Sequence, residues 1–163
     1  GKFLYDCIGV GAGVGSTLKT AGHNSGYYKF HAGATPKNPN YEYSKGIKNG
    51  DKFENRKAQA WTSVADRLRN TYNAITKGAK YEPHEMISIS SEIDNLEQLK
   101  NELSMPHRVT SERGKDMVEK KSVMKRRLKS EISPDLADAF IMAACPHLAD
   151  KNDAVRFNVS FYT

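Results

Sequence analysis

The stretch that decides the fold is YDCIGVGAGVGSTLKT, residues 5–20, in which an apolar run ends in Asp6 and leads into Gly9, Gly11, Gly13 and Gly15. Glycine-rich turns between a strand and a helix often bind phosphate through backbone N–H groups. A P-loop, however, needs two glycines separated by four residues and followed by lysine, and a dinucleotide turn needs glycines at relative positions one, three and six. Neither spacing occurs here. Two alternatives remain: a tight turn with close helix–strand packing, or chemistry that centres on Asp6.

The composition predicts one intracellular globular domain covering residues 1–163. The net charge is +6, from 25 Lys and Arg against 19 Asp and Glu, which favours a polyanionic partner such as nucleic acid. Cys7 and Cys145 are the only cysteines, and two free thiols in a reducing compartment are the simpler interpretation. No apolar run approaches the ~20 residues of a membrane span, and no signal segment opens the chain, so we expect no membrane partner.

Periodicity predicts alternating strands and helices, which is typical of an α/β layered domain. Strands are expected over residues 2–8, 27–31 and 86–90, and within 108–118 on either side of a turn at Gly114. Helices are expected after the glycines to about residue 20, over 55–75, from a capping box at 91–94, and over 133–144. Residues 33–53 are rich in Gly, Pro, Asn and Lys, which predicts a long, exposed and mobile loop.

The last predicted helix, SPDLADAFIMAA at residues 133–144, carries Asp138 within an otherwise apolar segment. A buried carboxylate without a partner is costly, so Asp138 must be paired with a cation, bind a metal, or face a cleft. Asp135 lies one turn earlier, where an acid is also favoured by the helix dipole alone. Together with Asp6, these carboxylates form a set of hard oxygen ligands of the kind that Mg²⁺ and Mn²⁺ prefer.

Taken in order, these motifs resemble one family. They are the strand ending in Asp6 with its GxGxG turn, a long loop before a helix that begins NRKAQAW at 55–61, and SPDLADAF preceded by EKKSVMKRR at 119–127. The pattern covers most of the chain and resembles the C-terminal nuclease domain of the terminase large subunit of tailed bacteriophages, the motor that packages and cuts viral DNA. The resemblance implies an α/β, ribonuclease H-like mixed sheet flanked by helices.

The resemblance also implies a site and partners. Asp6 and Asp138 correspond to catalytic, metal-binding aspartates, and Lys121 to a lysine that points toward two Mg²⁺ or Mn²⁺ ions; Asp135 is a candidate further ligand. The implied partners are double-stranded concatemeric DNA, the terminase ATPase domain, the small terminase subunit and the portal, in the cytoplasm of the infected bacterial host. DNA contacts are expected from Lys45, Lys48, Lys115, Lys120, Lys125, Arg126 and Arg127.

Two expectations qualify this hypothesis. In the family, a strand with another catalytic aspartate precedes the strand seen here. Either the chain is a part that lacks this strand and the ATPase domain, and is then expected to cleave weakly, or the resemblance misplaces the first strand. The alternative function is a non-catalytic, basic DNA-binding module in which Asp6 and Asp138 form salt bridges.

Overall fold

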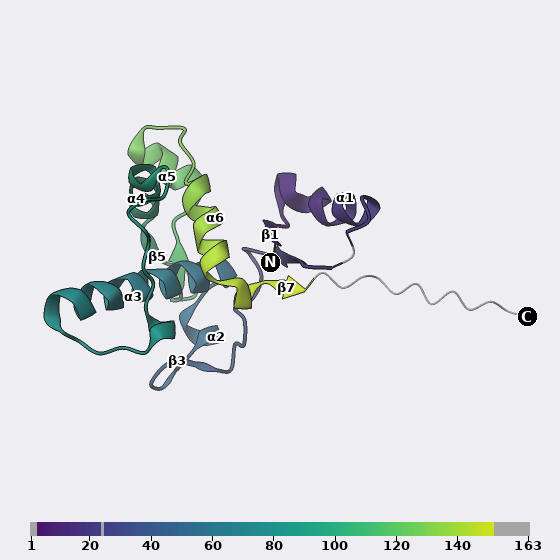
Figure 1. The fold of residues 1–163 in the computed structure, drawn as a ribbon. Coiled ribbons are helices and arrows are strands. Elements are labelled where there is room, and N and C mark those ends of the chain that lie inside the picture. The colour runs from purple at the N-terminus through teal and green to yellow at the C-terminus, as the bar shows by residue number, and fades with distance from the viewer. Residues whose placement is uncertain (1–2, 24, 152–163) are drawn as a thin grey trace, which may run out of the picture.

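The computed structural model describes residues 3–23 and 25–151, which form a small sheet and two hairpins with helices packed around them (Figure 1). The strands are β1 (Phe3–Asp6), β2 (Tyr27–Phe30), β3 (Glu42–Ser44), β4 (Ile47–Lys48), β5 (Arg108–Thr110), β6 (Asp116–Val118) and β7 (Asp150–Lys151). The α-helices are α1 (Val14–Thr20), α2 (Asn49–Lys52), α3 (Arg56–Lys77), α4 (Leu96–Ser104), α5 (Lys121–Leu128) and α6 (Asp135–Ala144). Short 3₁₀ helices cover Gly9–Gly13, Pro83–Glu85 and Pro146–Leu148.

The sheet has the strand order β1-β2-β7 and is mixed. β1 runs parallel to β2, with Asp6 opposite Phe30, and β2 runs antiparallel to β7, with Lys29 opposite Asp150. This confirms the predicted α/β class with a mixed sheet. Because the carboxyl ends of β1 and β2 lie side by side, the residues that follow Phe30 lie next to Asp6.

The glycine-rich segment owes its composition to a close backbone approach. A Cβ atom on Gly11 would lie 1.7 Å from the carbonyl oxygen of Asp6, so no other residue fits there without moving the strand. Gly9 has a φ of +62°, a left-handed conformation that glycine adopts without strain. The structure therefore explains the glycines by a tight turn packed against the end of β1, and this explanation is compatible with chemistry that centres on Asp6.

Helix α3 has a recognisable capping residue at each end. The Asn55 side chain accepts a hydrogen bond of 2.9 Å from the backbone N–H of Ala58, and Gly78 closes the helix in a left-handed conformation. The amino-terminal half of α3 is buried, whereas Tyr72 and Ile75 near its end are exposed. Figure 1 shows this end of α3 extending away from the rest of the molecule. The predicted helix is therefore confirmed, but only the amino-terminal half of its apolar face packs against the rest of the protein.

The core lies where α3, α6 and the sheet meet (Figure 1). It consists of the buried side chains of Phe30, Ala60, Val64, Ile141, Cys145 and Leu148. Cys145 and the half-buried Cys7 are both free thiols, as predicted. None of the described helices is both long and apolar enough to cross a membrane.

The prediction that residues 33–53 form one exposed loop is wrong in part. The segment contains the β3–β4 hairpin and α2, although most of the hairpin's side chains are exposed. Phe53 is completely buried, with its ring edge-on to Tyr43 at 4.8 Å between centroids, and the Asn49 side chain donates to the carbonyl of Asn38. These two aromatic rings anchor a segment that its Gly, Pro and Asn content alone marks as a loop.

The strand predicted over residues 86–90 does not form. The backbone of Ile87 instead pairs with the hydroxyl of Thr71 on α3, which receives the Ile87 N–H at 3.1 Å and donates to its carbonyl at 2.8 Å. The segment is thus tied to a helix, and it pairs with no strand among the residues that the structure describes. The following helix, α4, begins at Leu96 and not at the predicted capping box, because Asn95 adopts a left-handed conformation.

The remaining predictions are confirmed with small shifts. The two strands around Gly114 form the β5–β6 hairpin, with Arg108 opposite Val118. The last helix begins at Asp135, and Ser133 lies just before it without capping a backbone N–H. The strand predicted from residue 2 begins at Phe3, and Lys2 lies outside the described residues.

Candidate functional site

A cavity of about 320 Å³ lies between the carboxyl end of the sheet, the first turns of α3, the start of α5 and the middle of α6. Its charged lining consists of two aspartates and two lysines, Asp6, Asp138, Lys57 and Lys121. The rest of the lining is largely apolar, with Ile8, Phe30, His31, Ala32, Gly33, Trp61, Ile141 and Met142. The structure therefore brings Asp6 and Asp138, from opposite ends of the chain, to one cavity, and their role as metal ligands stays a prediction.

Asp6 reaches the cavity because it is the last residue of β1. Its Oδ1 atom accepts a hydrogen bond of 3.0 Å from the backbone N–H of Ile8, which holds the carboxylate over the turn. No Lys or Arg side chain of residues 3–23 or 25–151 lies within ion-pair distance of it. The carboxylate is exposed, so at least one of its oxygens is free to bind a ligand from the cavity.

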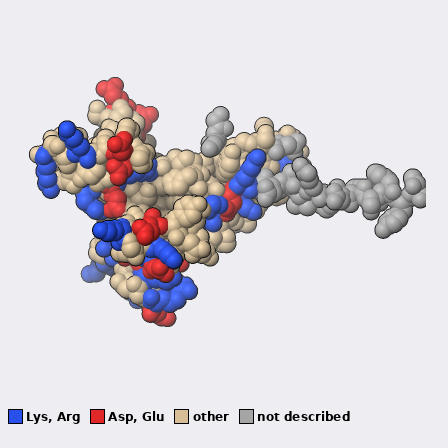
Figure 2. Space-filling view, turned by 90° about the horizontal axis from the view of Figure 1, so that it is seen from below, with Lys and Arg blue, Asp and Glu red and all other residues tan. Residues whose placement is uncertain are grey.

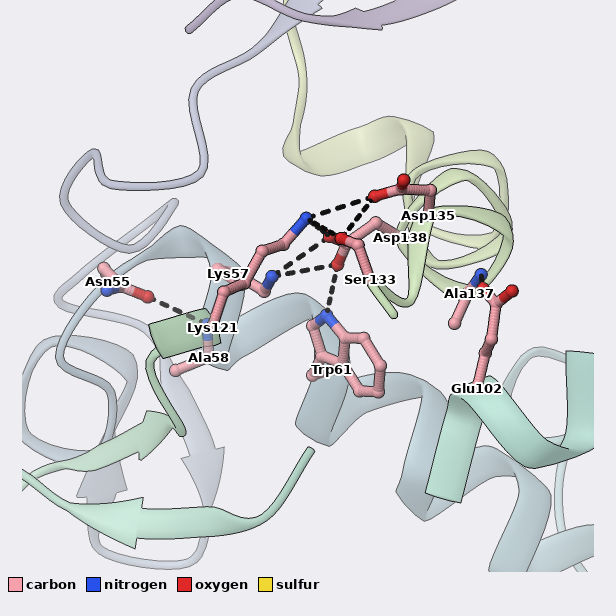
Figure 3. Close-up of polar contacts among 10 residues, drawn as sticks. All are labelled: Asn55, Lys57, Ala58, Trp61, Glu102, Lys121, Ser133, Asp135, Ala137 and Asp138. Atoms are coloured by element: carbon pink, nitrogen blue, oxygen red, sulfur yellow. Dashed lines mark hydrogen bonds and ion pairs between the residues drawn. The ribbon is translucent and has the colours of Figure 1, made fainter. Parts of the chain in front are cut away.

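Asp138 is held by three side chains from two other helices (Figure 3). The Lys57 ammonium on α3 lies 2.9 Å from Oδ1, and the Lys121 ammonium on α5 lies 3.1 Å from Oδ2. The indole N–H of Trp61 donates to Oδ1 at 3.3 Å. The Asp138 side chain is 25% exposed. Asp138 therefore forms the salt bridges of the alternative hypothesis, whereas Asp6 forms none among the described residues. A carboxylate that is paired with lysines can still bind a metal ion.

Lys121 links Asp138 to Asp135. Its ammonium lies 3.3 Å from Asp135 Oδ1 and donates to Ser133 Oγ at 3.0 Å, while that hydroxyl donates to Asp135 at 2.7 Å. Burial alone would lower the pKa of Lys121, but the two carboxylates outweigh it and hold the pKa above its ordinary value. The hydrogen bond from Ser133, followed by Lys121, lowers the pKa of Asp135. Asp135 is highly exposed and lies outside the cavity lining.

Helix α6 is itself fixed by a buried acid. Glu102 on α4 is 4% exposed, and its carboxylate accepts a hydrogen bond of 3.0 Å from the backbone N–H of Ala137. This N–H belongs to the first turn of α6, where helix donors have no partner within the helix (Figure 3). The other Glu102 oxygen accepts a hydrogen bond of 2.7 Å from the side-chain amide of Gln98. Glu102 therefore holds the turn that presents Asp138.

The donor chemistry of the cavity fits a divalent cation. Two carboxylates supply hard oxygen ligands, and that of Asp6 is exposed. The described residues bring no group of three or more His, Cys, Asp or Glu side chains close enough to hold a metal. Asp138 already faces two ammonium groups, so an ion bound here shares this carboxylate with them.

The predicted DNA-contacting cations fall into two groups. Three of them are engaged within the chain: Lys115 with the Gly50 carbonyl, Lys125 with Glu131 at 3.0 Å, and Arg127 with Glu119 at 2.7 Å. The other four, Lys45, Lys48, Lys120 and Arg126, are exposed and have no ion-pair partner among the described residues. Figure 2 shows Lys and Arg interspersed with Asp and Glu on the face that it presents, without one continuous basic band. DNA contacts from these residues stay a prediction.

Sequence reasoning missed three side chains that shape the site: Lys57, Trp61 and Glu102. Lys57 and Trp61 are four residues apart on α3, so they lie on the same face, and this spacing is visible in NRKAQAW. A lysine next to the apolar face of the predicted helix 55–75 could have been recognised as a possible ion-pair partner of Asp138. Glu102 carried no such signal, because it lies on α4 among other charged residues.

Comparison with solved structures finds the nuclease domain of the large terminase subunit gp2 of bacterial virus Sf6. It matches at a TM-score of 0.79 and 32% identity, over 88% of this chain and 64% of that chain. A lysine-to-alanine variant of the same domain with manganese gives a TM-score of 0.79 at 32% identity over 88% and 65% of the two chains. In fold and in sequence, the chain is similar to a phage terminase nuclease domain. The expected resemblance and the expected ribonuclease H-like fold are thereby confirmed.

The same lysine-to-alanine variant, solved with calcium, matches at a TM-score of 0.78 and 32% identity, over 88% of this chain and 64% of that chain. The chain therefore spans just under two thirds of the length of the terminase nuclease domains that it matches. No family model and no curated protein matches the sequence.

Proposed function

We propose that the chain is part of the endonuclease domain of a viral DNA-packaging motor and cuts double-stranded concatemeric DNA by divalent-metal-dependent phosphodiester hydrolysis. The observation that carries this proposal is the meeting of Asp6 and Asp138 in one cavity of a fold similar to a terminase nuclease domain. Solved forms of that domain contain manganese or calcium, which supports a divalent cation as the cofactor.

In this proposal Asp6 and Asp138 hold the metal. Two divalent ions, when bound, would supply an activated water and stabilise the leaving 3′ oxygen. Asp6 provides oxygens that no cation of the described residues claims, and Asp138 provides oxygens that Lys57 and Lys121 already neutralise in part. Asp135 is the candidate for a further ligand, and its carboxylate must leave Ser133 and Lys121 to reach the cavity.

Lys121 has the role of a fixed positive charge at the cavity wall. Its raised pKa keeps the ammonium protonated at neutral pH, so it can stabilise the negative charge of a phosphate that enters the cavity.

The DNA backbone is proposed to contact the exposed cations outside the cavity. Lys45 and Lys48 belong to the β3–β4 hairpin, and Lys120 and Arg126 lie at the start and in the last turn of α5. Such contacts neutralise phosphates without reading sequence, so binding weakens as salt rises. The further partners are the terminase ATPase domain, the small subunit and the portal, in the cytoplasm of the infected host.

Cleavage of supercoiled plasmid tests the proposal. The chain is incubated with plasmid and Mn²⁺ or Mg²⁺, and nicked and linear products are followed with time. We expect nicking that requires the metal, stops with EDTA and is lost in Asp138→Asn. Metal-independent nicking, or nicking that is unchanged in Asp138→Asn, would contradict it. The absence of nicking together with the absence of Mn²⁺ binding by calorimetry would contradict it as well.

A further inference from the structure

Both oxygens of Asp138 already face a cation or a hydrogen-bond donor. A carboxylate offers about four lone-pair positions. Lys57 contacts both oxygens, at 2.9 Å for Oδ1 and 3.2 Å for Oδ2, while Trp61 occupies Oδ1 and Lys121 occupies Oδ2 (Figure 3). A divalent cation that binds Asp138 must therefore displace at least one of these donors or share an oxygen with an ammonium group.

The two lysines differ in the partners that remain to them. If Lys121 leaves Asp138, it keeps Ser133 at 3.0 Å and Asp135 at 3.3 Å. Lys57 has no second carboxylate within ion-pair distance among the residues that the structure describes. Its other contact is the ring of Trp61, 5.8 Å from the ammonium to the centroid. Lys121 can thus withdraw to other partners, whereas Lys57, when it yields an Asp138 oxygen to an ion, has no other carboxylate to pair with among the described residues.

The position of Lys57 in α3 carries an electrostatic cost that the Asp138 carboxylate offsets. Lys57 is the second residue of this helix, and the first turn contains no acid. Cations near a helix amino terminus are disfavoured by the helix dipole. The Lys57 side chain is also only 23% exposed, so water compensates the charge poorly. The fold retains an ammonium group at this place against both effects.

We propose that Lys57 is the internal counter-ion of Asp138 and sets how tightly this centre binds a divalent cation. The proposal rests on the proposed function, since it takes the cavity to be a metal site. Lys57 opposes the incoming ion by like-charge repulsion and by occupying both oxygens of its ligand. In the absence of metal it keeps the Asp138 carboxylate paired and in place.

The test is Mn²⁺ binding, measured by calorimetry without DNA, in Lys57→Met and in a matched control. Methionine keeps the length of the side chain against Trp61 and removes the charge. The control is Lys52→Met: its side chain is 21% exposed, lies over the Tyr43 and Phe53 rings, and pairs with Asp116 at 3.4 Å, but does not line the cavity. We expect Mn²⁺ to bind about tenfold more tightly to Lys57→Met, a change of about 1.4 kcal/mol, and no more than about twofold differently to Lys52→Met.

A second readout uses Trp61, the only tryptophan of the chain. Saturating Mg²⁺ should change its emission in the wild type, because the ammonium over its ring moves, and should change it less in Lys57→Met. If Lys57→Met does not fold, Lys57→Gln replaces it with the same expected direction, while Lys57→Arg should bind Mn²⁺ as the wild type does.

The outcomes separate the inference from the proposed function. Tighter Mn²⁺ binding in Lys57→Met but not in Lys52→Met supports the counter-ion role. Unchanged or weaker Mn²⁺ binding in Lys57→Met overturns the counter-ion role and leaves Lys57 only a structural contact between α3 and α6. This holds even when Asp138→Asn abolishes Mn²⁺ binding and so supports the metal site. If the wild type binds no Mn²⁺ at millimolar concentration, both the metal site and the counter-ion role fail.

Discussion

Asp138→Asn is the substitution whose consequences the structure defines best. The amide keeps the shape of the side chain and removes one negative charge from a group 2.9 Å from Lys57 and 3.1 Å from Lys121. Exposed ion pairs contribute about 0–1 kcal/mol, and breaking a fully buried pair costs about 3–5 kcal/mol. With the Asp138 side chain 25% exposed, we expect a loss of about 2 kcal/mol in the free energy of unfolding. For a chain of this size, that loss lowers Tm by about 4–8 °C.

This stability loss cannot account for a loss of cleavage. A domain stable by at least about 5 kcal/mol keeps about 3 kcal/mol, so more than about 99% of the molecules stay folded at 25 °C. Removing a metal ligand should reduce the rate of plasmid nicking more than about 100-fold, since even changes to the groups around a ligand cost 10–100-fold. The assay is plasmid nicking with Mn²⁺ at 25 °C, with Tm and DNA affinity measured on the same preparation.

Asp150→Asn is the matched control. The Asp150 side chain is 32% exposed and pairs with two cations, Lys37 at 2.5 Å and Arg56, but it does not line the cavity. The control should lose Tm to a similar extent and keep its nicking rate, while Asp138→Asn should keep its DNA affinity, because phosphate contacts come from lysine and arginine. A folded Asp138→Asn variant that nicks plasmid at the wild-type rate would refute the catalytic assignment, and equal losses of nicking in both variants would reduce it to an effect of stability.

Three further substitutions probe the surroundings of the site. Asp6→Asn should abolish Mn²⁺-dependent nicking with little change in Tm, because its side chain contacts only the Ile8 N–H among the described residues; a large drop in Tm with nicking retained would contradict this. Glu102→Leu leaves the buried N–H of Ala137 without an acceptor, so unfolding should cost about 1–3 kcal/mol less, and an unchanged melting curve would exclude the capping role. Glu119→Gln should lower Tm at pH 7. The Arg127 hydrogen bond depresses the pKa of Glu119, so its contribution to stability is present above the ordinary pKa of about 4.3 and disappears as pH falls through the lower folded value. A difference in Tm that persists below that range would argue against the Arg127 pair as its cause.

The elements that the sequence predicts well are those with local causes. Helix α3 follows from Asn55 as its cap and from apolar residues at three- and four-residue spacing, and all of these signals lie within one segment. β1 and its glycine turn were predicted as well, since Asp6 ends a short apolar run. The reason for Gly11, its close approach to the Asp6 carbonyl, needs the fold.

The misplaced elements have partners that are distant in sequence. The segment at residues 86–90 has the composition of a strand, but its backbone hydrogen bonds go to Thr71, 16 residues away. Within the supposed loop, Tyr43 and Phe53 pack together, and the weight of Gly, Pro and Asn concealed these two anchors. Composition reports local backbone preference and not the partners that the backbone finds.

The site residues also divide into those with a local sequence signal and those that only the fold brings together. The sequence singled out Asp6 and Asp138 because an acid in an apolar element needs an explanation. Lys57 and Trp61 are 81 and 77 residues away from Asp138 in the chain, and only the packing of α6 against α3 brings them to its carboxylate. A charge pair of this kind leaves no local pattern.

The most direct test of a metal centre between Asp6 and Asp138 is the position of Mn²⁺ in crystals of the chain soaked in manganese. Anomalous scattering locates the ion independently of any assay of cleavage. The account predicts a peak inside the cavity, bound to oxygens of both aspartates, with the Lys57 ammonium moved from at least one Asp138 oxygen. Peaks only outside the cavity, with the Lys57–Asp138 pair intact at saturating Mn²⁺, would contradict it.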